Sequence, residues 1–227
     1  MEVAVGKASQ KIAPYTFDEF LSDIKPGFSF ARYGNGEWDL ILGLNYRTGS
    51  RTQYFSDGLR QAMRDTLLCH SGATLGMQIS FLTKIRLIGP ALNWLQKSGL
   101  EHLQWRESDV IHHASMAGRL HEFVDLIRGD IALIGPPHLS SLPFVDRHIV
   151  TPSVNAWDEY KSLLEQASGL RDCVILVSAG PTGKILVHDL HALQNGCTII
   201  DTGSVLDPYC GKRSRRYMQN MKFEPLK

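Results

Sequence analysis

The chain has 227 residues, of which 43% are hydrophobic and 21% are charged. These proportions are ordinary for a globular protein and exclude an intrinsically disordered chain, and the length suits one domain with a sizeable core. The formal net charge of +1 excludes a general electrostatic attraction to nucleic acid or membranes, so such a partner would have to meet a local patch.

The expected compartment follows from the lack of targeting signals and from the spacing of the cysteines. The first 15 residues lack the long apolar core of a signal peptide, and no stretch approaches the roughly 18 uncharged apolar residues of a membrane helix. Cys69, Cys173, Cys197 and Cys210 are widely spaced and include no CxxC pair, so we expect reduced, buried thiols. We therefore predict a cytoplasmic protein without a membrane span.

Short apolar runs along the chain are predicted to be strands. Four of the six lack an alternating polar face, which is typical of strands that are covered on both sides. In chain order, the predicted strands are 28–33, 73–79, 108–114, 130–135, 173–180 and 197–203.

Amphipathic segments between the strands carry helix start and stop signals. Thr16 opens a capping box, Ser56 precedes a segment with leucine and methionine spaced by four, and Asn155 is predicted to cap the next helix. A further helix is predicted from about Thr182 to Gly196. Strands alternating with helices predict an α/β fold with a doubly wound, mostly parallel, Rossmann-like sheet in one domain over residues 1–227. Ligands in such sheets bind beyond the carboxyl ends of the strands.

The first polar turn follows the strand at 28–33. Gly34 and Gly36 let the backbone approach a ligand closely, and the helix that starts there offers free N–H groups to an anion. Asn35 and Glu37 carry oxygen ligands suited to a hard divalent cation, and Arg32 can pair with phosphate. A plain glycine-rich turn with a carboxylate at a helix start remains the alternative.

The second polar turn follows the strand at 173–180. It is not a P-loop, because Ser178 stands where that motif needs glycine and Ile185 where it needs serine or threonine. What remains is a glycine-rich turn from strand to helix with a lysine one turn later, which suits a diphosphate. A simple connecting loop is the alternative. The candidate residues for binding such a diphosphate ligand are Ser178, Ala179, Gly180, Pro181, Gly183 and Lys184.

The third polar segment follows the strand at 197–203. Asp201 and Asp207 flank Gly203 and Ser204, and carboxylates at this edge can act as a general base or hold sugar hydroxyls. A basic run follows, which can neutralise phosphates or can simply be a solvated tail. Its candidate contact residues are Arg213, Arg215 and Arg216.

Three segments in this order resemble one known family. Residues 31–43 (ARYGNGEWDLILG), 178–190 (SAGPTGKILVHDL) and 198–217 (TIIDTGSVLDPYCGKRSRRY) are similar to motifs of the bacterial and phage glycosyltransferases of the GT-D fold, once grouped as a domain of unknown function. The resemblance spans about residues 16–217. It implies a GT-D type fold and transfer of a sugar from a nucleotide diphosphate donor, commonly a UDP-sugar. It also implies a divalent cation, Mn²⁺ or Mg²⁺, at an Asp-x-Glu motif.

That metal motif departs from the family pattern in this chain. It falls on Asn35 and Glu37, so an amide replaces the aspartate and the site loses one negative charge. We therefore expect weaker metal binding, metal binding that depends on the donor phosphates, or none.

The resemblance leads to a hypothesis for the residue roles. The diphosphate would lie between the first two turns, held by backbone donors of Gly180 and Gly183 together with Lys184 and Arg32. Glu37 would hold a metal or orient a sugar hydroxyl, Asp207 would deprotonate the acceptor, and Asp201 would contact ribose or sugar.

Other residues and functions remain open at this point. His138 is a further residue that could line the donor pocket. The acceptor would be a glycan or glycoconjugate. The alternatives are a DNA glycosyltransferase acting on a hydroxymethylated base and a non-catalytic nucleotide-sugar-binding protein.

Overall fold

Every strand pairing in the described part of the chain is parallel. A computed structural model describes residues 12–44, 53–79 and 86–226. Its eight strands form one sheet in the order β1-β4-β3-β2-β8-β7-β5-β6. The strands are β1 (Ile12–Ala13), β2 (Ser29–Tyr33), β3 (Thr74–Met77), β4 (Trp105–Glu107), β5 (Ile131–Gly135), β6 (Arg147–Val150), β7 (Val174–Val177) and β8 (Thr198–Asp201).

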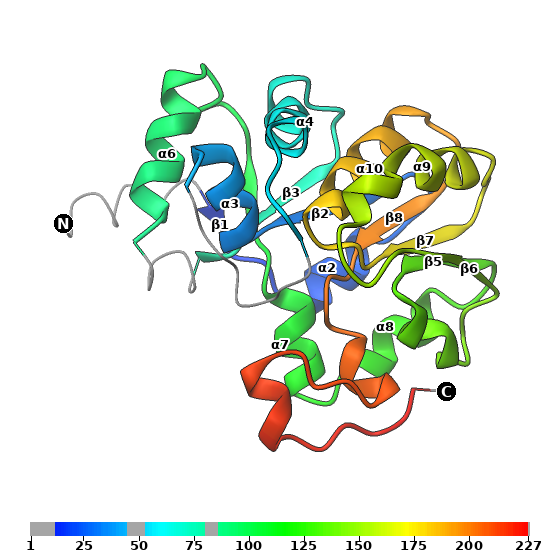
Figure 1. Cartoon of the computed structure of the whole chain (residues 1–227). Coiled ribbons are helices and arrows are strands. Elements are labelled where there is room, and N and C mark those ends of the chain that lie inside the picture. The colour runs from blue at the N-terminus through cyan, green and yellow to red at the C-terminus, as the bar shows by residue number, and fades with distance from the viewer. Residues whose placement is uncertain (1–11, 45–52, 80–85, 227) are drawn as a thin grey trace.

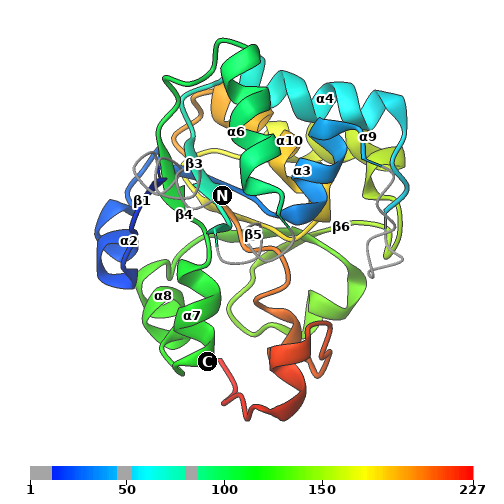
Figure 2. The same ribbon diagram turned by 90° about the vertical axis from the view of Figure 1, so that its left-hand side faces the viewer.

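Helices cover both faces of this sheet, as Figures 1 and 2 show. One face carries α3 (Asn35–Leu42), α4 (Asp57–Leu68), α6 (Ile88–Lys97), α9 (Tyr160–Ser168) and α10 (Gly180–Ala192). The other face carries α2 (Phe17–Asp23), α7 (Val110–Met116) and α8 (Leu120–Leu126). Short 3₁₀ turns complete the chain: η1 (Pro137–Ser141), η2 (Ala156–Glu159), η3 (Asp207–Cys210) and η4 (Arg216–Asn220). The predicted doubly wound α/β fold is confirmed.

The hydrophobic core has two parts because strand side chains alternate between the two faces of the sheet. On β2, Ala31 and Tyr33 pack into the cluster under α3, α4 and α10, whereas Phe30 packs into the cluster over α2 and α8. All five residues of β2 are buried. The central strands are therefore buried on both faces, and β5 and β7 are continuous apolar runs, as expected for such strands.

The predicted strand at 108–114 is wrong. That segment begins the helix α7, and the strand in this part of the chain is β4, just before it. Val110, Ile111 and Ala114 are buried together on one face of α7. A short apolar run with two histidines fits a strand and a buried helix equally well, so periodicity could not distinguish them. The short strands β1 and β6, at the two edges of the sheet, were not predicted either.

Local capping signals were mostly correct. The backbone N–H of Glu19 donates to Thr16 Oγ1 at 3.2 Å, and the N–H of Leu59 donates to Ser56 Oγ at 3.2 Å. Asn155 stands at the N-cap position of η2, as predicted, but its side chain makes no capping hydrogen bond, and its Oδ1 instead accepts the N–H of Tyr54 at 2.8 Å. Helix α10 also begins at Gly180, earlier than predicted. The two capping hydrogen bonds that were predicted correctly join residues three apart in the chain, whereas Asn155 contacts Tyr54, which is distant in the sequence.

Two remaining expectations concern the cysteines and membrane spans. All four cysteines are free thiols; Cys173 and Cys197 are buried, but Cys69 is exposed and Cys210 only partly buried, so the expectation of burial holds for two. Among the helices in the described ranges, none has the length and apolar character that crossing a membrane requires.

Candidate functional site

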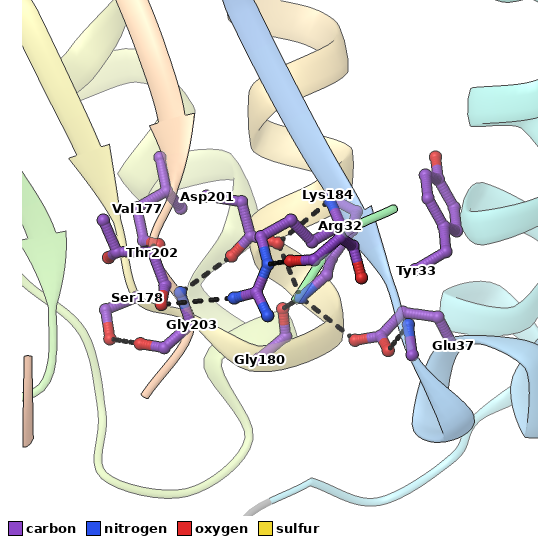
Figure 3. A network of polar contacts seen from close by, with 12 residues as sticks. Arg32, Tyr33, Glu37, Val177, Ser178, Gly180, Lys184, Asp201, Thr202 and Gly203 are labelled. Atoms are coloured by element: carbon purple, nitrogen blue, oxygen red, sulfur yellow. Dashed lines mark hydrogen bonds and ion pairs between the residues drawn. The ribbon is translucent and has the colours of Figure 1, made fainter. Parts of the chain in front are cut away.

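The carboxyl ends of β2, β8 and β7 lie side by side and bring the three polar segments together (Figure 3). At their centre is the ammonium group of Lys184. Its Nζ lies 3.0 Å from Glu37 Oε1 and 3.0 Å from Asp201 Oδ2, and it donates to the carbonyl oxygen of Gly180 at 3.1 Å. The first turn, the second turn and the end of β8 therefore form one buried polar cluster.

Glu37 belongs to the start of α3 as well as to this cluster. The N-cap residue Gly34 donates its backbone N–H to Glu37 Oε2 at 2.9 Å, so the carboxylate closes the first turn of its own helix. Burial by itself would raise the pKa of Glu37, but the Lys184 ammonium and the backbone N–H groups of Glu37 and Gly34 together outweigh it and hold the pKa below its usual value. Glu37 is therefore an ionised carboxylate with both oxygens engaged.

Asp201, the last residue of β8, is completely buried. Its Oδ1 accepts the backbone N–H of Gly203 at 3.0 Å, and its Oδ2 accepts the backbone N–H of Arg32 at 3.2 Å in addition to the contact with Lys184. These contacts join the ends of β2 and β8 through one side chain. Asp201 is placed to organise the site.

Arg32 extends from β2 toward α7, and all its side-chain partners are neutral. Nε donates to the carbonyl oxygen of Ser108 at 2.9 Å, Nη1 to that of Thr202 at 3.3 Å, and Nη2 lies 2.6 Å from Nδ1 of His112. Gly203 makes room for this guanidinium, since a Cβ there would lie 3.0 Å from Nη1. Because no carboxylate among the described residues pairs with the guanidinium, its positive charge remains available to an anionic ligand.

His112 is a site residue that the sequence pattern does not indicate, because the apolar run 108–114 predicts a strand and the residue lies on the helix α7. Its Nδ1 faces an obligatory donor, the Arg32 guanidinium, so this nitrogen accepts and the ring is neutral. Burial, followed by the charge of Arg32, lowers the pKa of His112 well below its ordinary value. The ring also packs edge-on against Tyr217, with the ring centroids 5.9 Å apart. His112 therefore connects the site to the C-terminal segment.

This lowered pKa predicts a pH-dependent stability. Below about pH 6.5 the unfolded chain protonates His112 and the folded chain does not, so folding stability is lost as the pH falls, by at most about 1.4 kcal/mol per pH unit. The free energy of unfolding, measured in urea, should therefore change less between pH 7 and pH 5 in the variant His112→Gln than in wild type. His121→Gln, at an exposed position on α8, is the matched control. An unchanged slope in His112→Gln would contradict the assignment.

The second turn leaves the start of α10 without a side-chain cap. The N-cap residue is Ala179, and Thr182 Oγ1 is buried without a hydrogen-bond partner among the described residues. Ser178 Oγ instead donates to the carbonyl oxygen of Gly203. Gly183 has a packing role, because a Cβ there would lie 3.1 Å from Val177 Cγ1. The helix start therefore retains free backbone donors beside Arg32 and Lys184, as an anion site requires.

The residues predicted to hold a metal do not fit a divalent cation well. Both oxygens of Glu37 are already engaged, and Asn35 offers only a neutral amide. Within residues 12–44, 53–79 and 86–226, no group of three or more His, Cys, Asp or Glu side chains could hold a metal ion. Mg²⁺ is usually held by one or two carboxylates together with waters and substrate phosphates, and the one carboxylate of this predicted pair already faces Lys184 and Gly34.

The third segment contributes a second titratable pair. His138, in η1 after β5, places Nε2 2.8 Å from Oδ1 of Asp207 in η3. The His138 side chain is 22% exposed and that of Asp207 is 8% exposed, so the histidine has the freer access to a ligand. The sequence suggested each residue separately, and the structure joins them.

The three predicted basic residues have different surroundings. Arg213 Nη1 binds backbone carbonyls around η4, including that of Met221 at 2.8 Å, which fixes the C-terminal turn. Arg215 Nε donates to Ser204 Oγ at 2.9 Å, which places this arginine beside the third segment. Arg216 is exposed. Only Arg215 is therefore tied to a predicted site residue.

A hollow of about 410 Å³ lies elsewhere, on the outside of α9 and α10. It is lined by residues such as Lys161, Leu164 and Asp189 and includes none of the predicted site residues. This hollow is therefore separate from the candidate site, which is the polar cluster at the strand ends.

Comparison with known proteins identifies the type of fold. Residues 145–220 match the family model described as glycosyltransferase GT-D fold, while a search of curated proteins gives no match. One similar solved structure is described as a new glycosyltransferase (DUF1792) from Streptococcus sanguinis, with a TM-score of 0.69, 19% identity, and coverage of 94% of each chain. Another is described as the highly conserved domain of unknown function 1792 with a distinct glycosyltransferase fold. It has a TM-score of 0.67 and 21% identity over 98% of this chain and 94% of that one. The structural similarity over nearly the whole chain shows that this protein has the GT-D type of fold, and residues 145–220 match the model of that glycosyltransferase family.

Proposed function

We propose that this GT-D protein transfers a sugar from a nucleotide diphosphate donor, a UDP-sugar by preference, to a hydroxyl group of a glycan or glycoconjugate. The observation that carries the proposal is the positive centre at the ends of β2 and β7. There, the Arg32 guanidinium has only neutral partners, and the start of α10 has no side-chain cap. A diphosphate supplies the negative charge and the acceptor oxygens that this arrangement lacks.

The donor would bind with its diphosphate between the first and second turns. Backbone N–H groups at the start of α10 and the two free N–H groups of Arg32 would hold the phosphate oxygens and stabilise the charge that develops on the leaving nucleotide. Arg215, which is held near the end of β8 by Ser204, is positioned to add a further charge. Glu37 and Asp201 keep this framework in place through Lys184.

Proton transfer from the acceptor is assigned to the pair of His138 and Asp207. With Nε2–H of His138 donating to Asp207 Oδ1, Nδ1 of the ring is free to take the hydroxyl proton. The hydroxyl oxygen then forms a bond to the anomeric carbon of the sugar. The bond from that carbon to the diphosphate breaks, and the nucleotide diphosphate leaves with the electron pair. Asp207 would stabilise the imidazolium that forms, in place of acting as the base alone.

A donor screen tests the proposal. The protein is incubated with UDP-, GDP- and TDP-sugars, with and without Mn²⁺, and released nucleotide is measured; we expect release with at least one UDP-sugar. Arg32→Gln should weaken UDP binding about tenfold or more, because it removes a charge-assisted contact to phosphate. Arg171→Gln, at an exposed position before β7, is the matched control and should bind UDP like wild type.

Two outcomes would contradict the proposal in different ways. Calorimetric UDP binding without release or transfer for any donor and acceptor would favour a non-catalytic nucleotide-sugar-binding protein. Absence of nucleotide binding altogether would remove the donor assignment.

A nucleic-acid acceptor, such as a hydroxymethylated base, has less support. Arg213 is used to hold the C-terminal turn, which leaves Arg215 and Arg216 of the predicted basic cluster for phosphate contacts. Salt-sensitive binding of duplex DNA that is lost in the double variant Arg215→Gln/Arg216→Gln would favour this acceptor.

A further inference from the structure

The Lys184 ammonium is fully coordinated by the site. A lysine ammonium has three N–H donors, and here they are directed to Glu37 Oε1, Asp201 Oδ2 and the carbonyl oxygen of Gly180, at 3.0, 3.0 and 3.1 Å. Its side chain is 6% exposed, while those of Glu37 and Asp201 are 10% and 0% exposed. The buried Lys184 ammonium thus bridges two carboxylates, one at the start of α3 and one at the end of β8 (Figure 3).

Both carboxylates of this cluster are already fully engaged. Glu37 Oε1 and Asp201 Oδ2 face the Lys184 ammonium. The carboxylate oxygens that do not face Lys184 accept backbone N–H groups, from Gly34 at 2.9 Å and from Gly203 at 3.0 Å. A divalent cation entering here would have to displace these donors and share the two carboxylates with a buried ammonium, which would place two cations side by side.

We propose that Lys184 occupies the position of a divalent cation between Glu37 and Asp201, so that this protein binds its nucleotide donor without a metal ion. The neutral amide at Asn35 is consistent with this arrangement, since a site that holds a monovalent ammonium needs fewer negative ligands than one that holds Mn²⁺. The ammonium is part of the chain, so the site is assembled when the protein folds. The statement about donor binding rests on the proposed function, whereas the occupation of the site by Lys184 does not.

Titration of the apoprotein with Mn²⁺ alone tests the occupation directly. We expect no saturable binding to wild type in the micromolar range by calorimetry or by the electron paramagnetic resonance signal of free Mn²⁺. Tight stoichiometric binding to wild type that disappears in Glu37→Gln would overturn the proposal. This measurement needs neither a donor nor activity.

A variant that is expected to gain Mn²⁺ binding provides a second test. Lys184→Met removes the ammonium and leaves two buried carboxylates facing each other, so we expect this variant to unfold at a lower temperature and to be restabilised by Mn²⁺ by several degrees. The double variant Lys184→Met/Glu37→Gln retains only one of the two carboxylates and should be stabilised much less by Mn²⁺. Lys161→Met, at an exposed position on α9, should behave like wild type.

If Lys184→Met does not fold, the Mn²⁺ titration of wild type and Glu37→Gln still decides the question. If Lys184→Met folds and Mn²⁺ raises the unfolding temperature of wild type and of the variant equally, Lys184 does not occupy the position of a divalent cation.

Donor binding separates this inference from the proposed function. We expect the UDP dissociation constant of wild type to change by less than about twofold between EDTA and Mn²⁺ buffers, well under the 1.4 kcal/mol of a tenfold effect. UDP binding that requires Mn²⁺ would overturn the inference and leave the proposed function intact. Absence of UDP binding in both buffers would remove the proposed function, while the Mn²⁺ titration would still report on Lys184.

Discussion

Replacing Asp201 with alanine is expected to lower the free energy of unfolding by about 3–5 kcal/mol, the usual cost of removing one partner of a buried ion pair. Asp201 is completely buried, and its loss leaves the Lys184 ammonium with one carboxylate. It also removes the side-chain acceptor of the Arg32 backbone N–H and leaves the Gly203 N–H with only the carbonyl oxygen of Val177, at 3.3 Å. Equilibrium unfolding in urea measures the effect.

Two control variants separate the contributions at this position. Asp201→Asn keeps an oxygen for one backbone N–H but removes the charge, so its stability should lie between those of wild type and Asp201→Ala. Asp57→Ala removes a carboxylate that is 96% exposed and paired with Arg60, and should cost at most about 1 kcal/mol. If Asp201→Ala were no more destabilising than Asp57→Ala, the buried cluster would not be the stabilising feature described here.

The substitution His138→Asn is expected to reduce the rate of sugar transfer by about 10²–10⁴-fold, the usual contribution of a general base. Asparagine has no basic nitrogen and cannot take a proton from the acceptor. Nucleotide affinity should stay within about twofold of wild type, because His138 follows β5 and is assigned no contact with the diphosphate. Steady-state kinetics for transfer and calorimetry for UDP binding measure the two effects separately.

The matched control is His102→Asn, at an exposed position before β4, which should leave transfer unchanged. Asp207→Asn should reduce transfer less than His138→Asn if the carboxylate acts through the histidine. The reverse order would make Asp207 the base itself, as its position after β8 first suggested. Loss of UDP affinity in His138→Asn equal to the loss in rate would show that the residue binds the donor and does not transfer the proton.

Local sequence patterns predicted much of the fold. The caps at Thr16 and Ser56 involve partners three residues away, so a short window contains all the information they need. The strands β5 and β7 are continuous apolar runs because both of their faces are covered, and this feature is visible in the residues themselves. The strands β2 and β8 are mostly apolar and end in the polar residues of the site. The helix α7 was missed because its apolar run is too short for its period to be read.

The sequence by itself also located the three polar segments that follow β2, β7 and β8, since parallel strands place their carboxyl ends at one edge of the sheet. Only the tertiary structure decided which side chains meet there. Lys184 joins Glu37 and Asp201, Arg32 joins His112, and His138 joins Asp207, each pair coming from different strand ends. The physical reason is strand order. Residues far apart in the chain become neighbours only when β2, β8, β7 and β5 align in the sheet, and no local propensity specifies that order.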